Sequence, residues 1–285
     1  MSFLMAIFLG IVQGITEFLP ISSSGHLAIF QNFGLEDPHD RHLFFDTLLH
    51  LGTLIAVFIV YRKDIADMWR ATLSLVRGRG QREVHGTDER RVPQSKARLA
   101  LMIIIATLPL VFILPLRRQV EFLGSQTWFV GLMLLVTGGI LFLSDKLVKG
   151  YRDEKNMTAK NAIVIGFFQL FAIMPGISRS GTTITGGMLT GLDRAFAVRF
   201  SFLMSIPAIL GANIIVFFTS MSDVDWSLMP QYLVGFVVAT VVGYFAIGLV
   251  KRIVDAGKFG KFAYYCWGLG ALAILVWLGS LIFGG

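Results

Sequence analysis

The sequence predicts an all-α polytopic membrane protein with six transmembrane helices and two re-entrant broken helices, arranged as an inverted repeat. Three observations predict this fold class. The chain is 55% hydrophobic and only 15% charged, with a mean hydropathy of +0.70, whereas a typical soluble domain is about 25% charged. Apolar stretches long enough to cross a bilayer recur along its 285 residues. Two further apolar stretches share an interrupting polar motif. We expect residues 1–285 to form a single membrane domain.

Six apolar stretches can each form a transmembrane helix, because a spanning helix needs about 20 mostly apolar residues. They lie at residues 43–61, 97–116, 126–147, 195–218, 229–250 and 262–282. Two others, at residues 3–33 and 161–190, are interrupted by Pro, Ser and Gly. No basic leader or small-residue cleavage site precedes the first interruption, so we expect that stretch to stay in the mature protein. Cys266 is the single cysteine, which excludes an internal disulfide and a thiolate metal cluster.

The basic residues predict the orientation of the chain, since cytoplasmic loops carry an excess of Lys and Arg. The segment 62–98 holds ten of them, and the loops 145–160 and 251–261 are also basic. We therefore expect these three loops in the cytoplasm. Successive spans must place their connecting loops on alternate sides of the membrane. This agrees with the three cytoplasmic loops only if the broken stretch at 161–190 enters and leaves from the cytoplasmic side and the one at 3–33 enters and leaves from the outer face.

The net charge of +7 does not indicate nucleic acid as a partner, because the basic residues lie in connecting loops without an aromatic-basic groove. Membrane lipids are the expected partner. The segment 62–98 could bind anionic headgroups, each Lys or Arg near the surface contributing about 1 kcal/mol, or it could be a solvated loop that only sets topology. Arg117 and Arg118 fall outside against the trend, in a short loop.

The two interrupted stretches resemble each other. "GIVQGITEFLPISSSG" (residues 10–25) and "GFFQLFAIMPGISRSG" (residues 166–181) share Gly, Gln, Ser, Ser and Gly at one constant separation. Each is followed by three predicted spans, so residues 1–150 and 151–285 are expected to be two copies with an odd number of crossings, which makes them inverted. In proteins of this kind the two breaks meet near the bilayer midplane and form the site. Irregular backbone survives there only when it is buried in protein or lines a wet cavity.

Serines precede the second half of each interrupted stretch and are expected to cap it as a helix. Two helix N-termini with unpaired N–H groups would then face each other, an arrangement that favours an anion and above all phosphate. Arg179 lies between the serines of the second motif. An Arg at membrane depth costs about 2.5–3.5 kcal/mol on insertion scales and calls for a partner. That partner is either a phosphate bound by its planar fork or Glu17, in a salt bridge that only locks the fold.

Other polar residues near the first motif are candidates for the same site. Gln13 and Glu17 are four apart and share one helix face. Glu17 could act as a base, a cation ligand or the partner of the Arg. His26 could transfer a proton or bind a leaving oxygen, or it could be a satisfied core residue. Asp46 and His50, also four apart, form either a second polar layer or a helix end at the interface. These spacings support a phosphorylated ligand at the midplane and do not establish catalysis.

The two motifs also identify a family. "QGITEFLPISSSGH" (residues 13–26) together with "PGISRSGTT" (residues 175–183) resembles the undecaprenyl-pyrophosphate phosphatase family associated with bacitracin resistance, and the likeness covers essentially the whole chain. It extends to "FDTLLHLGTLIAV" from Phe45 and "FSFLMSIPAILGA" from Phe200. The resemblance implies an integral enzyme of the bacterial plasma (inner) membrane. Such an enzyme removes the terminal phosphate of a C55 polyprenyl pyrophosphate and so regenerates the monophosphate carrier lipid for peptidoglycan.

The resemblance implies roles for individual residues. Ser23 is the nucleophile or positions a water, Arg179 clamps the phosphate, and Glu17 and His26 handle protons or the cation. The phosphate-binding set is Gln13, Ser22, Ser24, Gly25, Gly176, Ser178, Ser180, Thr182 and Thr183. The family implies a divalent cation, Mg²⁺ or Ca²⁺, with Glu17 as its ligand. Because Gln13 stands where the first motif often begins with Glu, the cation would bind mainly through substrate phosphates.

A different class of function also fits the predicted fold. Inverted repeats with broken helices are typical of secondary transporters, so a carrier or lipid flippase for an anionic, phosphorylated substrate is the alternative, as is a protein that both hydrolyses and flips its lipid. The serine-rich tip with His and Arg nearby favours the enzyme, since a carrier does not require it. The prenyl length, the metal, the nucleophile and the oligomeric state, a homodimer included, are left open. The family likeness favours an outer-facing site.

Overall fold

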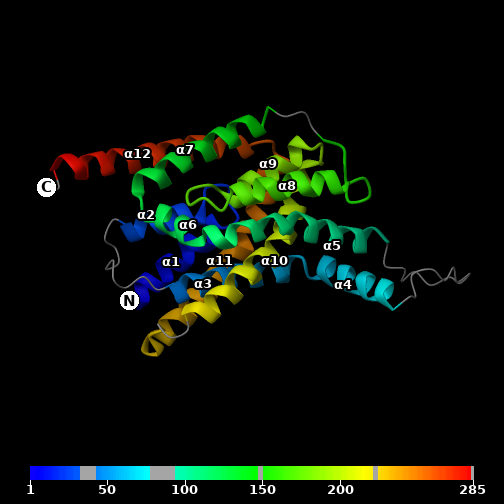
Figure 1. Cartoon of the computed structure of the whole chain (residues 1–285), viewed down its shortest axis with the longest axis horizontal. Coiled ribbons are helices and arrows are strands. Elements are labelled where there is room, and N and C mark those ends of the chain that lie inside the picture. The colour runs from blue at the N-terminus through cyan, green and yellow to red at the C-terminus, as the bar shows by residue number, and fades with distance from the viewer. Residues whose placement is uncertain (33–42, 78–93, 147–149, 221–223, 284–285) are drawn as a thin grey trace, which may run out of the picture.

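The computed structural model describes residues 1–32, 43–77, 94–146, 150–220 and 224–283, which form a bundle of helices (Figure 1). In these residues the regular structure is helical apart from an isolated bridge between Arg152 and Leu192. The elements are α1 (Phe3–Thr16), α2 (Ser23–Asn32), α3 (Leu43–Val60), α4 (Arg62–Val76), α5 (Gln94–Thr107), η2 (Leu108–Leu116), α6 (Arg117–Gly124), α7 (Thr127–Ser144), α8 (Ala159–Phe171), α9 (Arg179–Leu189), α10 (Arg194–Ser220), η4 (Trp226–Leu228), α11 (Met229–Asp255), η5 (Phe259–Lys261) and α12 (Phe262–Phe283).

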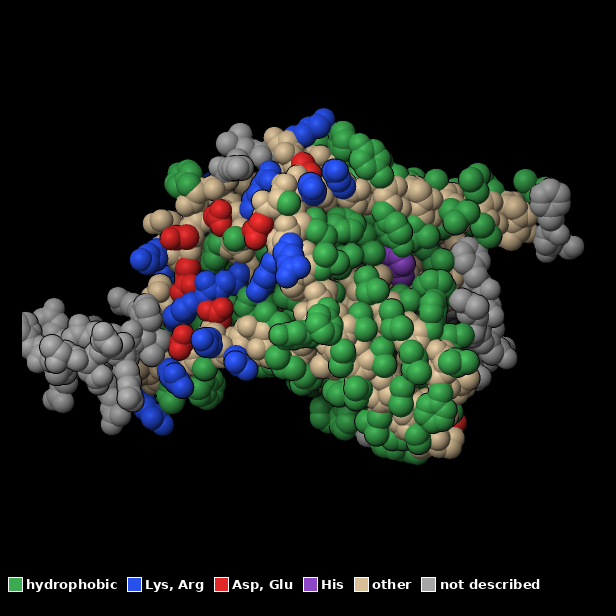
Figure 2. All heavy atoms as spheres, turned by 180° about the vertical axis from the view of Figure 1, so that it is seen from behind, with side chains coloured by type: hydrophobic (Ala, Val, Ile, Leu, Met, Phe, Trp, Pro, Cys, Tyr) green, Lys and Arg blue, Asp and Glu red, His purple; other side chains and the backbone are tan. Residues whose placement is uncertain are grey.

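Five helical segments of the described chain are long and apolar enough to cross a membrane, and a bent pair makes a sixth. The five are Ser95–Gly124, Thr127–Ser144, Arg194–Phe218, Trp226–Asp255 and Phe259–Ile282. They coincide with five of the predicted spans, and the sixth prediction falls on α3 of the bent pair. Figure 2 shows hydrophobic side chains over most of one face, with Lys, Arg, Asp and Glu gathered at one end. This surface and the apolar helices are those of a multi-pass membrane protein.

The segment 62–98, predicted as a loop, is partly helical. α4 begins directly after α3 and is bent from it by 79°. Met68 and Ala71 of α4 are buried while its basic residues are exposed. The segment is therefore an amphipathic helix, which its high charge does not suggest. α5 starts at Gln94, and residues 78–93 lie outside the described part of the chain.

The predicted outer loop after residue 116 is also helical. Arg117 and Arg118 open α6, which continues the apolar path of α5 through the 3-10 helix η2. Pro109 and Pro115 lie in η2, where proline cannot supply the N–H that an α-helix needs. The change of helix type therefore follows from the prolines, and the charged residues begin a short amphipathic helix rather than a loop.

Both predicted interruptions are present. α1 ends at Thr16 and α2 begins at Ser23, while α8 ends at Phe171 and α9 begins at Arg179. α1 has 14 residues and α8 has 13, so each is about 20 Å long at about 1.5 Å per residue, less than the hydrocarbon thickness of about 30 Å. Neither helix can cross a bilayer alone.

Close helix packing holds the interruptions inside the protein. A Cβ on Gly10 of α1 would lie 2.7 Å from the carbonyl oxygen of Gly235 in α11, and one on Gly52 of α3 would lie 2.5 Å from that of Phe236. These glycines let three backbones approach closely, as small residues do in membrane bundles. α7 runs along α12 (Figure 1) and also contacts both α2 and α9. It therefore brings the second halves of the two broken stretches to one place.

Candidate active site

The two interruptions touch each other. The Ser180 hydroxyl donates to the carbonyl oxygen of Leu19 at 3.2 Å. A Cβ on Gly181 would lie 3.1 Å from Cβ of Pro20, and one on Gly25 would lie 3.2 Å from Cα of Gly176. Gly25 and Gly181 are corresponding residues of the two motifs. In each motif a side chain at this glycine would clash with the other break, so the close contact requires glycine at both positions.

Serines cap both second-half helices, as the sequence predicts. The Gly25 N–H donates to Ser22 Oγ at 3.1 Å, and the Gly181 N–H donates to Ser178 Oγ at 3.1 Å. Ser24 lies 3.3 Å (Oγ to Oγ) from Ser22, and Ser180 lies 3.3 Å from Ser178. The two caps are thus built alike, with Ser23 and Arg179 at the corresponding position between their serines.

Glu17 is the centre of the candidate site. Its Oε1 accepts from Arg179 Nη2, and its Oε2 accepts from Ser23 Oγ at 2.8 Å and from Gln13 Nε2 at 3.0 Å. His50 Nε2 lies 3.7 Å from the same oxygen. The structure therefore brings together four residues that the sequence selected and adds His50 from the predicted second polar layer. We use "Glu17 cluster" for Gln13, Glu17, Ser23, His50 and Arg179.

The Glu17 cluster has a buried side and an accessible side. The side chain of Glu17 is 4% exposed, whereas that of Arg179 is 23% exposed. Ser23 is half-buried and Ser24 is exposed. Arg179 does pair with Glu17, yet one carboxylate cannot take all five guanidinium donors. The buried carboxylate holds a serine hydroxyl and an arginine side by side, and both remain partly exposed. A nucleophile, its base and an anion clamp require residue types of this kind in contact.

His26 is engaged away from Ser23. Its Nδ1 lies 2.7 Å from the carbonyl oxygen of Ser22, and its Nε2 lies 2.7 Å from the hydroxyl of Tyr265 in α12. The His26 and Tyr265 rings are parallel within 3°. The sequence offered no signal for Tyr265, which is 239 positions from His26 in an apolar helix.

Some predicted phosphate-binding residues use their polar atoms inside the protein. Thr183 Oγ1 donates to the carbonyl oxygen of Arg179 at 2.8 Å and lies 2.6 Å from Ser201 Oγ. The carbonyl of Gly176 accepts from Thr137 Oγ1 at 2.9 Å, and Thr137 Oγ1 in turn accepts from the backbone of Ser178. These contacts shape the second break. Thr137 is a further residue that the motifs did not reveal.

Three polar atoms near the breaks are buried without a hydrogen-bond partner among the described residues. They are Gln13 Oε1, Gln169 Oε1 and Thr182 Oγ1. Among all the residues that the structure describes, no group of three or more His, Cys, Asp or Glu is arranged to hold a metal ion. Glu17 and the Gln13 carbonyl oxygen are oxygen donors of the kind that hard cations prefer. They fit a cation completed mainly by a ligand's own phosphate oxygens.

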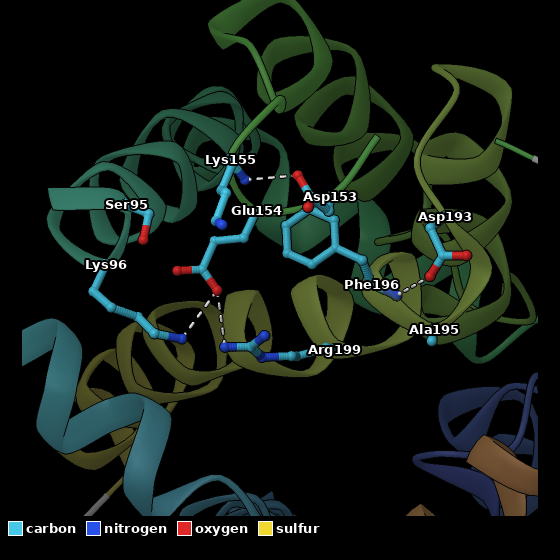
Figure 3. Close-up of a pocket in the computed structure, with 9 residues that line it drawn as sticks. All are labelled: Ser95, Lys96, Asp153, Glu154, Lys155, Asp193, Ala195, Phe196 and Arg199. Carbon is cyan, nitrogen blue, oxygen red and sulfur yellow. Dashed lines mark hydrogen bonds and ion pairs between the residues drawn. The ribbon is translucent and has the colours of Figure 1, made fainter. Parts of the chain in front are cut away.

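A separate set of charges joins α4, α5, α10 and the segment before α8. Lys96 Nζ lies 2.9 Å from Asp64 Oδ1 and 2.9 Å from Glu154 Oε2, and Arg199 Nη2 lies 3.0 Å from the same Glu154 oxygen. Figure 3 shows Lys96 and Arg199 reaching this carboxylate. All three residues line a cavity of about 470 Å³. The opposite charges neutralise one another, so this "charge network" of Asp64, Lys96, Glu154 and Arg199 holds helix ends together.

Fold and site together define a multi-pass membrane protein with an ionisable cluster buried between two broken helices. The chain belongs to the family described as bacitracin resistance protein BacA, which matches residues 6–272. Similar proteins named undecaprenyl-diphosphatase occur in several organisms. That of Methanobrevibacter smithii is 42% identical over 284 residues, 99% of each chain. That of Methanosphaera stadtmanae is 39% identical over 276 residues (96% of this chain, 97% of the relative), and that of Alkaliphilus metalliredigens is 40% identical over 279 residues (95% and 97%).

Proposed function

We propose that this protein hydrolyses undecaprenyl pyrophosphate to undecaprenyl phosphate and inorganic phosphate, recycling the carrier lipid for cell-wall polymer synthesis. Membership of the family and the undecaprenyl-diphosphatases it resembles over nearly their full length support this activity. The observation that carries the proposal is the hydrogen bond from Ser23 to the buried carboxylate of Glu17, with Arg179 on the other oxygen.

Ser23 is the proposed nucleophile and Glu17 its base. As the Ser23 oxygen attacks the terminal phosphorus, its proton passes to the Glu17 oxygen that lies 2.8 Å away. The anhydride P–O bond breaks and releases undecaprenyl phosphate. Water then cleaves the phosphoserine to give inorganic phosphate and free Ser23. In the one-step alternative, Ser23 and Glu17 position and deprotonate the attacking water instead.

Arg179 is the proposed phosphate clamp. Phosphoryl transfer depends chiefly on positioning and on stabilising the charge of the transferred group. The guanidinium is held by Glu17 on one side and is partly exposed on the other, so it can donate to a phosphate oxygen without losing its partner. The backbone N–H groups at the start of α2 and α9 add positive potential from the two helix N-termini.

A divalent cation, Mg²⁺ or Ca²⁺, belongs to the proposal. Glu17 and Gln13 would hold it together with the phosphates of the substrate, and it would supply charge neutralisation at the transferred group.

We also propose that residues 1–150 and 151–285 are inverted copies, each with one re-entrant broken helix and three spans. The alike caps, the reciprocal contacts of Gly25 and Gly181 and the shortness of α1 and α8 support this arrangement. The basic segments 62–98, 145–160 and 251–261 are proposed to face the cytoplasm of a cell whose plasma membrane holds the protein, with the site open to the outer face.

The test is phosphate release by the purified protein in detergent, with a short polyprenyl pyrophosphate and a series of divalent cations. We expect release by the wild type and a loss of at least about 10²-fold in Ser23→Ala and Arg179→Ala. Full turnover by Ser23→Ala would eliminate the covalent route. If the wild type releases no phosphate with any cation, the protein is not a phosphatase, and the carrier alternative gains support.

A further inference from the structure

The ring of His26 has one defined tautomer. The carbonyl oxygen of Ser22 can only accept, so the Nδ1 atom 2.7 Å from it carries the proton. In the neutral ring Nε2 is then the acceptor, and the Tyr265 hydroxyl 2.7 Å away is placed to donate to it. Both ring nitrogens are thus used, one on the first break and the other on α12.

The residue that His26 contacts has an unusual backbone. Ser22 has a φ of 69° and is the one non-glycine residue with a positive φ in the described chain. Such a conformation persists only when surrounding contacts hold it, and it clusters at functional sites. Its carbonyl oxygen accepts from His26 Nδ1 and from the His26 N–H at 3.2 Å, and its Oγ accepts from Gly25. Ser22 directly precedes Ser23, so its backbone sets the direction in which the Ser23 hydroxyl points.

We propose that Tyr265 is a positioning residue of the active site. Its hydroxyl holds the His26 ring against the Ser22 carbonyl and thereby keeps Ser23 directed at Glu17. This rests on the proposed phosphatase function, to which it adds a residue outside both motifs. The contacts of Tyr265 with His26 and of His26 with Ser22 link α12 to the first break. Only 17% of the residues in the apolar stretch of this span are buried inside the protein.

The competing view is that Tyr265 is only an aromatic residue at the membrane surface. Tyrosines are common there, and Tyr265 is 47% exposed. Its neighbour Tyr264 gives a matched control. Tyr264 is 64% exposed, and its ring packs edge-on against Trp267 with centroids 5.7 Å apart. If surface location were the whole role of Tyr265, Phe at either position would behave alike.

The experiment compares Tyr265→Phe with Tyr264→Phe in the phosphate-release assay. Phe keeps the ring and removes the hydroxyl, so we expect kcat of Tyr265→Phe to fall about tenfold with KM unchanged, because the hydroxyl acts through His26. Tyr264→Phe should match the wild type. In a His26→Ala background, Tyr265→Phe should cause no further loss, since the hydroxyl then has no ring to hold.

A spectroscopic readout tests the contact itself. In protein labelled with ¹⁵N-histidine, the Nε2 resonance that His26→Ala removes should move toward a free imine nitrogen in Tyr265→Phe and stay in place in Tyr264→Phe. Wild-type kcat in Tyr265→Phe, or independent losses in the double variant, overturns the inference while the proposed function stands. An inactive wild type would refute the function, and the resonance would still decide whether the contact exists.

Discussion

Replacing Glu17 by Gln removes the negative charge on which the candidate site is centred. Glu17 accepts from Arg179, Ser23 and Gln13, and its side chain is 4% exposed. A glutamine places an NH₂ group where at least one of these donors now binds, and it cannot take the Ser23 proton. The variant tests the base and the ion pair at once.

The expected losses are large. General-base catalysis contributes about 10²–10⁴-fold, equivalent to about 3–5 kcal/mol of activation free energy, so kcat of Glu17→Gln should fall by that factor. Breaking a buried ion pair costs about 3–5 kcal/mol of stability. Because the Arg179 side chain is 23% exposed, we expect the lower end, about 3 kcal/mol.

Phosphate release and thermal unfolding in detergent measure the two effects separately. Glu121→Gln is the matched control, since Glu121 pairs with Arg117 at 2.6 Å but has a side chain 49% exposed. A surface pair contributes about 0–1 kcal/mol, so this control should keep its activity and melting temperature. A folded Glu17→Gln protein with more than about a tenth of the wild-type kcat would refute the assignment of Glu17 as base.

Two further predictions concern the contact between the breaks and the charge network. Gly181→Leu should lower the melting temperature and phosphate release together, because a Cβ at this position would already lie 3.1 Å from Pro20 Cβ. Gly139→Ala is the control and should be tolerated, since a Cβ at Gly139 would have nothing within 4 Å. An active, stable Gly181→Leu protein would show that the breaks need not touch. Lys96→Ala should cost about 1.5–3 kcal/mol of stability, because Lys96 bonds two carboxylates, while kcat at a temperature where it stays folded should not change. The exposed Lys63→Ala is its control, and equal melting temperatures for the two variants would count against the charge network.

The sequence by itself determined the spans and the breaks. Hydropathy is a local property, so apolar stretches marked the membrane helices, and Pro, Gly and Ser marked the two interruptions because they act on the backbone where they stand. The motif repeat went further. It placed Glu17 and Arg179 in one site although 162 positions separate them, because each lies in or beside one of the two repeated motifs. The prediction of loops was wrong at α4 and α6, because the charged residues of these segments lie on amphipathic helices.

Only the tertiary structure decided which partners the polar side chains take. It turned His26 from Ser23 toward Tyr265, engaged Thr183 with Ser201 and brought His50 to within 3.7 Å of Glu17. These pairings depend on how helices distant along the chain pack side by side. A polar residue that must find a partner in a low-dielectric interior takes the nearest donor or acceptor that packing supplies. Tyr264 and Tyr265 are adjacent in an apolar helix, and nothing in the local sequence marks Tyr265 as the one that contacts His26.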